Sequence, residues 1–165
     1  MELNDVPPGQ EIAVDANLLV YHFAGGSPQC SDFLCRVAPG RIRAWTGVQI
    51  LAELTHRLMI LEAQARGLLR GNNPARRLRR RPDIVRDLTG YAESVRAASV
   101  ILADIVPRTL DVIERSAIVR KASGLLTNDS LLVAMMEIRG TTALATADSD
   151  FERIRGVQLY CPSDL

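Results

Sequence analysis

The chain has 165 residues, of which 47% are hydrophobic and 24% are charged, and its formal net charge is +1. These values are typical of a soluble globular protein, and we expect a single domain over residues 1–165. The near balance of charge excludes a protein that binds nucleic acid over its whole surface, although it allows a local basic patch. No apolar run approaches the roughly 20 residues of a membrane-spanning helix, and the first residues, MELNDVPPGQE, do not resemble a signal peptide. We therefore expect a cytoplasmic protein that has no membrane partner.

The first half of the chain alternates short apolar segments with amphipathic ones, whose apolar residues recur three or four positions apart. In chain order, its predicted elements are a strand over 12–15, a helix over 17–23 that Asn17 caps, a short helix over 31–37, a strand over 42–47 and a helix over 48–69. The last of these is expected to stop before RGNNP, because Gly, Asn and Pro break helices.

The second half continues the alternation of strands and helices. Its predicted elements are one long helix over 83–102, a strand over 105–106, a helix over 111–123, a helix capped at Asn128 or Thr127, a strand over 141–146, a short helical turn over 148–154 and a strand over 157–160. Gly124 and Gly140 are placed to end the two helices that precede them, since glycine readily adopts the left-handed conformation found there. Short strands that alternate with helices predict an α/β fold, a three-layer α/β/α sandwich with a mostly parallel central sheet.

Carboxylates follow the strands of this predicted sheet. Asp15 ends the first strand, Asp148 and Asp150 follow the strand over 141–146, and Glu53 and Asp129 lie in the first turns of helices. Each acid alone has a structural interpretation as a helix cap or as a solvated residue. Because the carboxyl ends of parallel strands meet at one edge of a sheet, Asp15, Glu53, Asp129 and Asp148 are predicted to converge there.

A cluster of carboxylates at one edge suits a hard cation. Carboxylate oxygens favour Mg²⁺ or Mn²⁺, and no His or Cys spacing in the chain suits zinc. An ion held in this way can activate a water molecule and stabilise the charge of a phosphoryl displacement. The acidic set therefore indicates a metal-dependent enzyme that acts on phosphate esters.

Four stretches, AVDANLLVY, ILAELTHR, LLTNDSLLVAMM and LATADSDFERI, resemble in order the motifs of the PIN domain, the nuclease fold of VapC-type toxins. The resemblance extends from Ile12 to Tyr160. It implies an endoribonuclease whose Mg²⁺ or Mn²⁺ is held by the same four acids, with Asp150 beside Asp148 and with Asn17 and Thr146 orienting the acids.

The same resemblance implies the partners of the protein, which are an RNA substrate and an antitoxin that wraps the chain and places a basic side chain among the acids. A homodimer is also considered. Two alternatives stay open: a PIN nuclease that processes RNA without an antitoxin, and a binding or scaffold module that has lost turnover.

The segment 62–82 is longer and more basic than a compact member of the family needs. Its run ARRLRRRP is either a solvated loop or helix end, or a patch that contacts RNA phosphates through Arg76, Arg77, Arg79, Arg80 and Arg81. No aromatic residue interrupts the run, so base stacking is not predicted from it. His22, His56 and Trp45 are interpreted as structural residues.

Overall fold

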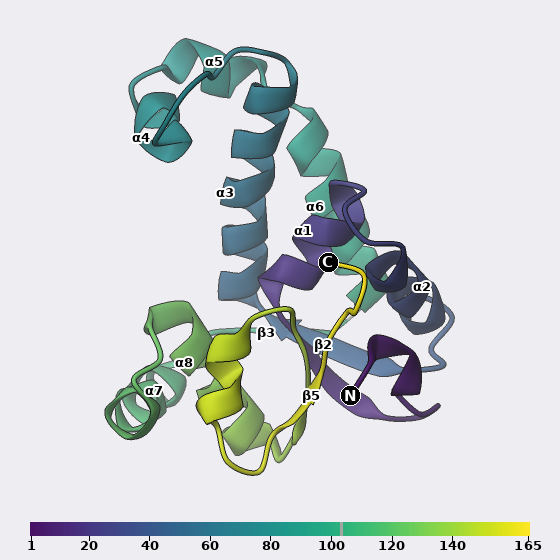
Figure 1. The fold of residues 1–165 in the computed structure, drawn as a ribbon. Coiled ribbons are helices and arrows are strands. Elements are labelled where there is room, and N and C mark those ends of the chain that lie inside the picture. Colours follow the sequence, from purple (N-terminus) through teal and green to yellow (C-terminus); the bar gives the residue numbers. More distant parts are fainter. Residues whose placement is uncertain (103) are drawn as a thin grey trace.

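A five-stranded sheet lies at the centre of the chain in the computed structural model, which describes residues 1–102 and 104–165 (Figure 1). Its strands are β1 (Glu11–Val14), β2 (Arg43–Gly47), β3 (Asp104–Val106), β4 (Ala143–Ala145) and β5 (Gln158–Tyr160). They lie in the order β3-β2-β1-β4-β5, and every pairing between these strands is parallel. The predicted α/β sandwich with a parallel central sheet is confirmed.

The order of the strands reverses at β1, and the carboxyl ends of β1 and β4 flank the point of reversal. β2 and β3 extend the sheet on one side of β1, whereas β4 and β5 extend it on the other. Ala13 is the residue of β1 that pairs with both neighbours, Trp45 of β2 and Leu144 of β4. In open parallel sheets, ligands bind outside the carboxyl ends of the strands at such a reversal. The fold therefore indicates where a site belongs before any side chain is considered.

Helices cover the sheet, and most residues of its central strands β1 and β4 are apolar and buried beneath them. They are α1 (Ala16–Phe23), α2 (Pro28–Val37), α3 (Val48–Ala65), α4 (Pro74–Arg79), α5 (Pro82–Asp87), α6 (Gly90–Leu102), α7 (Leu110–Ser123) and α8 (Thr127–Arg139), with 3-10 helices η1 (Leu3–Asp5) and η2 (Ser149–Arg153). One group consists of α1, α2, α3 and α6, which contact one another, and a second consists of the hairpin of α7 and α8. Among the helices of the described residues, none combines the length and the apolar character that crossing a bilayer requires.

Several predicted helix ends agree with the structure, and two predicted caps are wrong. Gly124 (φ 74°) and Gly140 (φ 73°) end α7 and α8 in the left-handed conformation, as predicted. However, the N-cap of α1 is Asp15 instead of Asn17, because the chain enters the helix directly from β1. The N-cap of α8 is Leu126 and not Asn128 or Thr127, because the helix already begins at Thr127. Asn17 is therefore inside its helix, and its side chain is free to contact another segment.

The predicted long helix over 83–102 is wrong, because α5 and α6 are separate helices. Leu88 has an extended backbone (ψ 129°) and is buried. The side chain of Glu62, on α3, accepts hydrogen bonds from the backbone N–H groups of Thr89 (3.1 Å) and Tyr91 (2.9 Å). These bonds satisfy amide groups at the start of α6 that have no partner within the helix. The break thus depends on a residue that is distant in the sequence.

Residues 66–89, here called the arm, leave the end of α3 and return at α6. The helix α3 ends at Ala65 and not near Leu69, although Leu69 is still buried. The arm packs on the end of α3 through a small hydrophobic cluster that is separate from the main core, and its buried members are Ala63 of α3 and Leu69, Leu78, Ile84 and Leu88 of the arm. Figure 1 shows α4 and α5 of the arm at the end of α3 that is remote from the sheet. The arm therefore lies apart from the main core, and Glu62 fixes its return.

Replacing Glu62 with alanine is expected to destabilise the protein. The substitution removes the charged acceptor of two N–H groups, of which that of Tyr91 is partly buried, and this should cost about 1–3 kcal/mol. For a domain of this size, each kcal/mol lowers the melting temperature by about 2–4 °C. Glu114→Ala, at an exposed position of α7, is the matched control for thermal denaturation. Equal melting temperatures for the two variants would contradict the role of Glu62.

Candidate active site

Asp15 lies at the carboxyl end of β1, and its side chain is almost completely buried. Only 5% of the residue is exposed. Its Oδ1 accepts a hydrogen bond from the backbone N–H of Ala16 at 2.7 Å, and its Oδ2 accepts one from the hydroxyl of Thr146 at 2.9 Å. The pKa of Asp15 is raised to about 7: burial is the main cause and the negative charges of Glu53 and Asp129 add to it, whereas the two hydrogen bonds oppose the rise. The ionised form of Asp15 therefore needs a nearby positive charge to be stable at neutral pH.

Thr146 joins the two strand ends that flank the reversal of the sheet. It is fully buried, and its Oγ1 donates to Asp15 while accepting the backbone N–H of Asp148 at 3.0 Å. Asn17 reinforces this junction, since its Oδ1 accepts the backbone N–H of Ala147 at 3.0 Å. Asp148 in turn accepts the backbone N–H of Asp150 at 2.9 Å and caps η2. The segment after β4 is thus held against the end of β1 by side chains from both.

Glu53 approaches this region from α3 and is oriented by two residues that the sequence did not reveal. Its Oε2 accepts a hydrogen bond from Asn128 Nδ2 at 2.8 Å, and its Oε1 lies 3.7 Å from Arg57 Nη1. Arg57 is four residues after Glu53, a spacing at which helical side chains meet. The sequence pattern assigns Asn128 only the role of a helix cap. Because Leu126 is the actual cap, the amide of Asn128 can reach across to α3.

Asp129 experiences the charges of the other acids. Burial raises the pKa of Asp129, and the charges of Asp148, Glu53 and Asp150 raise it further. The charge of Glu53 therefore acts on both Asp15 and Asp129, and that of Asp148 acts on Asp129. Asp150 is paired more closely than Glu53: its carboxylate lies 2.5 Å from Arg153 Nη2, compared with 3.7 Å between Glu53 and Arg57, and its side chain is 45% exposed.

The model of the PIN domain family matches residues 12–157, which is most of the chain. The chain belongs to the PIN domain family. No curated protein matches it in sequence.

Solved structures share the fold of this PIN domain at low sequence identity. A chain in the crystal structure of VapBC2 from Rickettsia felis, bound to a DNA fragment from its promoter, has a TM-score of 0.59 and 14% identity, and the match covers 92% of this chain and 98% of that one. A toxin–antitoxin complex from Klebsiella pneumoniae gives a TM-score of 0.54 at 16% identity, with 89% and 95% covered. VapC20 from Mycobacterium tuberculosis, a toxin that cleaves the sarcin–ricin loop, gives 0.54 at 17% identity, with 86% and 92% covered.

The side chains of this PIN domain suit a divalent cation in their chemistry, but they do not form a ready cage for one. The donors are carboxylate oxygens, and burial and neighbouring charges raise the pKa of both Asp15 and Asp129. As the side chains lie, however, no three His, Cys, Asp or Glu residues within 1–102 and 104–165 form a group that could hold a metal ion. Binding an ion would therefore require the carboxylates to turn toward it.

The five predicted RNA-binding arginines do not share the position of the acids. Arg76, Arg77 and Arg79 lie on α4 of the arm, and Arg80 and Arg81 follow directly. The guanidinium of Arg81 contacts both carboxylate oxygens of Asp83, at 2.6–3.1 Å, and is thereby neutralised. The other four form no ion pair with any residue that the structure describes.

The stability of the metal-free protein is expected to fall as the pH rises from about 4 to about 7. The folded-state pKa of Asp15 is raised, so within this window the native state binds a proton that the unfolded chain has lost. The contribution of Asp15 to stability is fully present below its pKa in the unfolded chain, and it is lost as the pH rises through its pKa in the folded protein. The difference between the two pKa values corresponds to roughly 4 kcal/mol. Asp15→Asn should remove most of this dependence and should melt higher than the parent at pH 8 in EDTA.

Chemical denaturation in EDTA at several pH values measures this effect. Asp32→Asn, at an exposed position of α2, is the control and should follow the parent. If Asp15→Asn and the parent lose stability in parallel between pH 4 and pH 7, another group is responsible.

Proposed function

We propose that this PIN domain is a divalent-metal-dependent endoribonuclease and the toxin of a toxin–antitoxin pair. One observation carries the proposal. Asp15 is 5% exposed, its pKa is raised to about 7, and the charges that raise it include those of Glu53 and Asp129, from two other helices. Proteins rarely bury an acid beside other acids unless the arrangement serves a function. A bound cation would remove the repulsion.

The proposed ion is Mg²⁺ or Mn²⁺, and its ligands would be Asp15, Glu53, Asp129 and Asp148. When bound, such an ion supplies an activated water molecule and stabilises the negative charge that develops on the phosphate. The chain's own residues provide orientation. Thr146 fixes the Asp15 carboxylate and Asn128 fixes that of Glu53.

Asp150 is proposed to act beside this set and not within it. Its carboxylate is already paired with Arg153, and its charge contributes to the raised pKa of Asp129. A carboxylate in a close ion pair with arginine is a weaker ligand than Asp148, which forms no ion pair with any residue that the structure describes. Asp148 is therefore the preferred fourth ligand, in agreement with the motif resemblance.

The proposed substrate is RNA. VapC20, whose chain shares the fold of this one, is a toxin that cleaves the sarcin–ricin loop. Arginines without ion-pair partners in the described part of the arm provide the positive charge that a phosphate backbone requires. An antitoxin is proposed as the partner, because two of the similar structures are a VapBC assembly and a toxin–antitoxin complex. The homodimer stays a prediction.

Replacing Asp129 with asparagine should lower the rate of RNA cleavage by about 100-fold or more. Removing even a residue that orients a metal ligand typically costs about 10- to 100-fold, and loss of a ligand should cost at least as much. The measurement is single-turnover cleavage of a panel of cellular RNAs by the purified protein, in Mn²⁺ and in EDTA.

Thr146→Val, which removes the hydroxyl bonded to Asp15, should lower the rate by about 10- to 100-fold.

Asp32→Asn is again the control, because it changes an exposed carboxylate to an amide outside the site. Cleavage that persists in EDTA, or that is unaffected by Asp129→Asn, would contradict a metal-dependent mechanism. A protein that binds RNA but cleaves none of the panel would support a scaffold module instead.

Expression of the parent protein in a bacterial host is expected to slow growth, whereas expression of Asp129→Asn at the same level should not. The reason is that an active ribonuclease without its antitoxin degrades cellular RNA. Growth curves and immunoblots of the two strains give the comparison. If an enzyme that is active in vitro is harmless in cells, the protein is an RNA-processing nuclease and not a toxin.

A further inference from the structure

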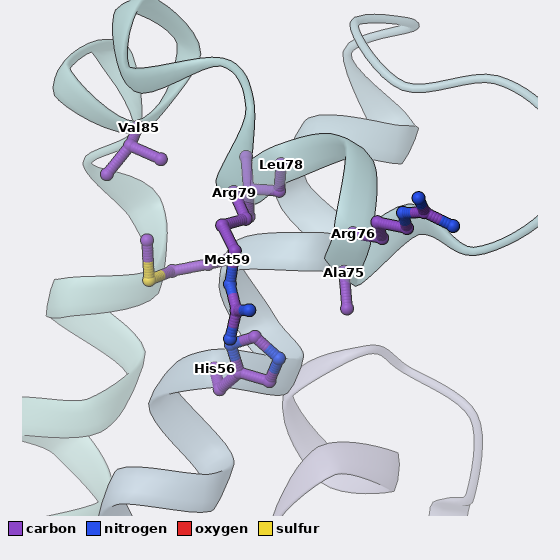
Figure 2. A pocket seen from close by; sticks show the side chains of 7 residues that line it. All are labelled: His56, Met59, Ala75, Arg76, Leu78, Arg79 and Val85. Carbon is purple, nitrogen blue, oxygen red and sulfur yellow. The ribbon is translucent and has the colours of Figure 1, made fainter.

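A cavity of about 540 Å³ lies between α3 and the arm. His56 and Met59 of α3 form one side, and Ala75, Arg76, Leu78 and Arg79 of α4 form the other, with Val85 of α5 at the end. Its volume is within the range of about 300–1,000 Å³ that is usual for sites that bind small molecules. Figure 2 shows these side chains around the cavity. The cavity is therefore large enough for a flat heterocycle.

The walls of the cavity combine apolar surface with two flat, polar groups. Met59, Leu78 and Val85 are apolar, while His56 and Arg79 contribute an imidazole and a guanidinium. In Figure 2 the side chain of Arg79 extends from α4 in the direction of His56. Neither the imidazole of His56 nor the guanidinium of Arg79 has a hydrogen-bond partner among the residues that the structure describes. Imidazole and guanidinium planes are surfaces on which unstacked RNA bases pack.

The arm is also where the positive charge of the chain is concentrated. It contains eight of the 20 basic residues and only two of the 19 acidic ones, Asp83 and Asp87. Asp83 neutralises Arg81 and leaves Arg76, Arg79 and Arg80 without ion-pair partners in the described chain. Arg76 lines the cavity, and Arg76 and Arg80 also line a second hollow beside it. Anionic groups would thus be attracted to the rim of the cavity, while its walls accept an apolar ring.

The cavity is connected to the acidic region through α3. His56 follows Glu53 by three residues, so the two side chains occupy neighbouring positions about one turn apart on the same helix. A single strand of nucleic acid spans such a distance within a few nucleotides. One molecule can therefore contact the cavity and the carboxylates together.

We propose that this cavity binds one unpaired base of the RNA substrate, with Arg76 and Arg80 contacting the phosphates on either side of that base. The proposal rests on RNA being the substrate, and it adds that the protein selects RNA whose bases are free to leave the stack. Bases within a duplex are not accessible to such a pocket. The arginine run contains no aromatic residue on which a base could stack, but the structure places His56 opposite that run.

The test separates contact with a base from contact with the backbone. Two fluorescein-labelled probes are used in EDTA, where no metal supports cleavage: an eight-nucleotide oligoadenylate, rA8, and an eight-unit abasic ribose-phosphate chain. The parent should bind rA8 about fivefold more tightly, or better, since stacking of one base on a protein side chain contributes at least about 1 kcal/mol. Fluorescence anisotropy measures both dissociation constants.

Ala75→Phe fills the cavity from an exposed position of α4 without changing its charge. This variant should bind rA8 no better than the abasic chain, with its affinity for the abasic chain unchanged. His56→Ala, which requires no additional space, should also lower the ratio of the two dissociation constants, that for the abasic chain divided by that for rA8. Ala92→Phe, at an exposed position of α6 outside the cavity, should keep the parent ratio.

The double variant Arg76→Ala/Arg80→Ala should weaken both probes equally and lower the slope of log affinity against log salt by about 0.7 for each lost contact. A parent protein that does not distinguish rA8 from the abasic chain would overturn the proposal, as would Ala75→Phe and His56→Ala variants that keep the parent ratio. These outcomes are independent of the cleavage assay, so a protein that fails to cleave RNA can still show base discrimination, and the reverse also holds.

Discussion

The burial of a single carboxylate, that of Asp15, is the constraint on which the rest of the site depends. One of its oxygens accepts the first amide of α1, and the other accepts the hydroxyl of Thr146. Through Thr146, the backbone of Asp148 is attached to the same point. Two strands that are distant in the sequence thus end at one group. Burial and neighbouring charges raise the pKa of that group, and this is the feature on which the proposed cation site rests.

Capping and catalysis are not alternatives for these acids. Asp15 caps α1 and Asp148 caps η2, as a purely structural interpretation requires. A carboxylate has about four lone-pair positions, however, and a cap uses one or two of them. The remaining positions are available to a metal ion. The hydrogen bonds of the cap fix the orientation of the carboxylate and therefore the direction of its remaining lone pairs. The contacts that start the helices would thus also orient the proposed metal ligands.

The molecule separates its charges in space. The predicted acids follow the carboxyl ends of strands or start helices there, whereas eight of the 20 basic residues lie in the arm, which packs against the other end of α3. Mixing the two would neutralise both, as the pair of Arg81 and Asp83 illustrates. Separation along one helix would keep the proposed cation site and the proposed phosphate contacts from neutralising each other. The side chain of Glu62 maintains this arrangement, because it fastens the return of the arm to α3.

The sequence by itself determined what depends on local chemistry. The alternation of strands and helices, the glycine ends of α7 and α8, and the acids after β1 and β4 follow from hydrophobic period, backbone preference and the geometry of parallel sheets. Only the tertiary structure decided what depends on contacts between distant residues. The break between α5 and α6 is fixed by Glu62, some 27 residues away. Asn128 reaches Glu53 across 75 positions, and His56 meets the arm only because α4 folds back against α3. A local sequence pattern does not predict such contacts. Each of them forms only when elements that are distant in the sequence pack together.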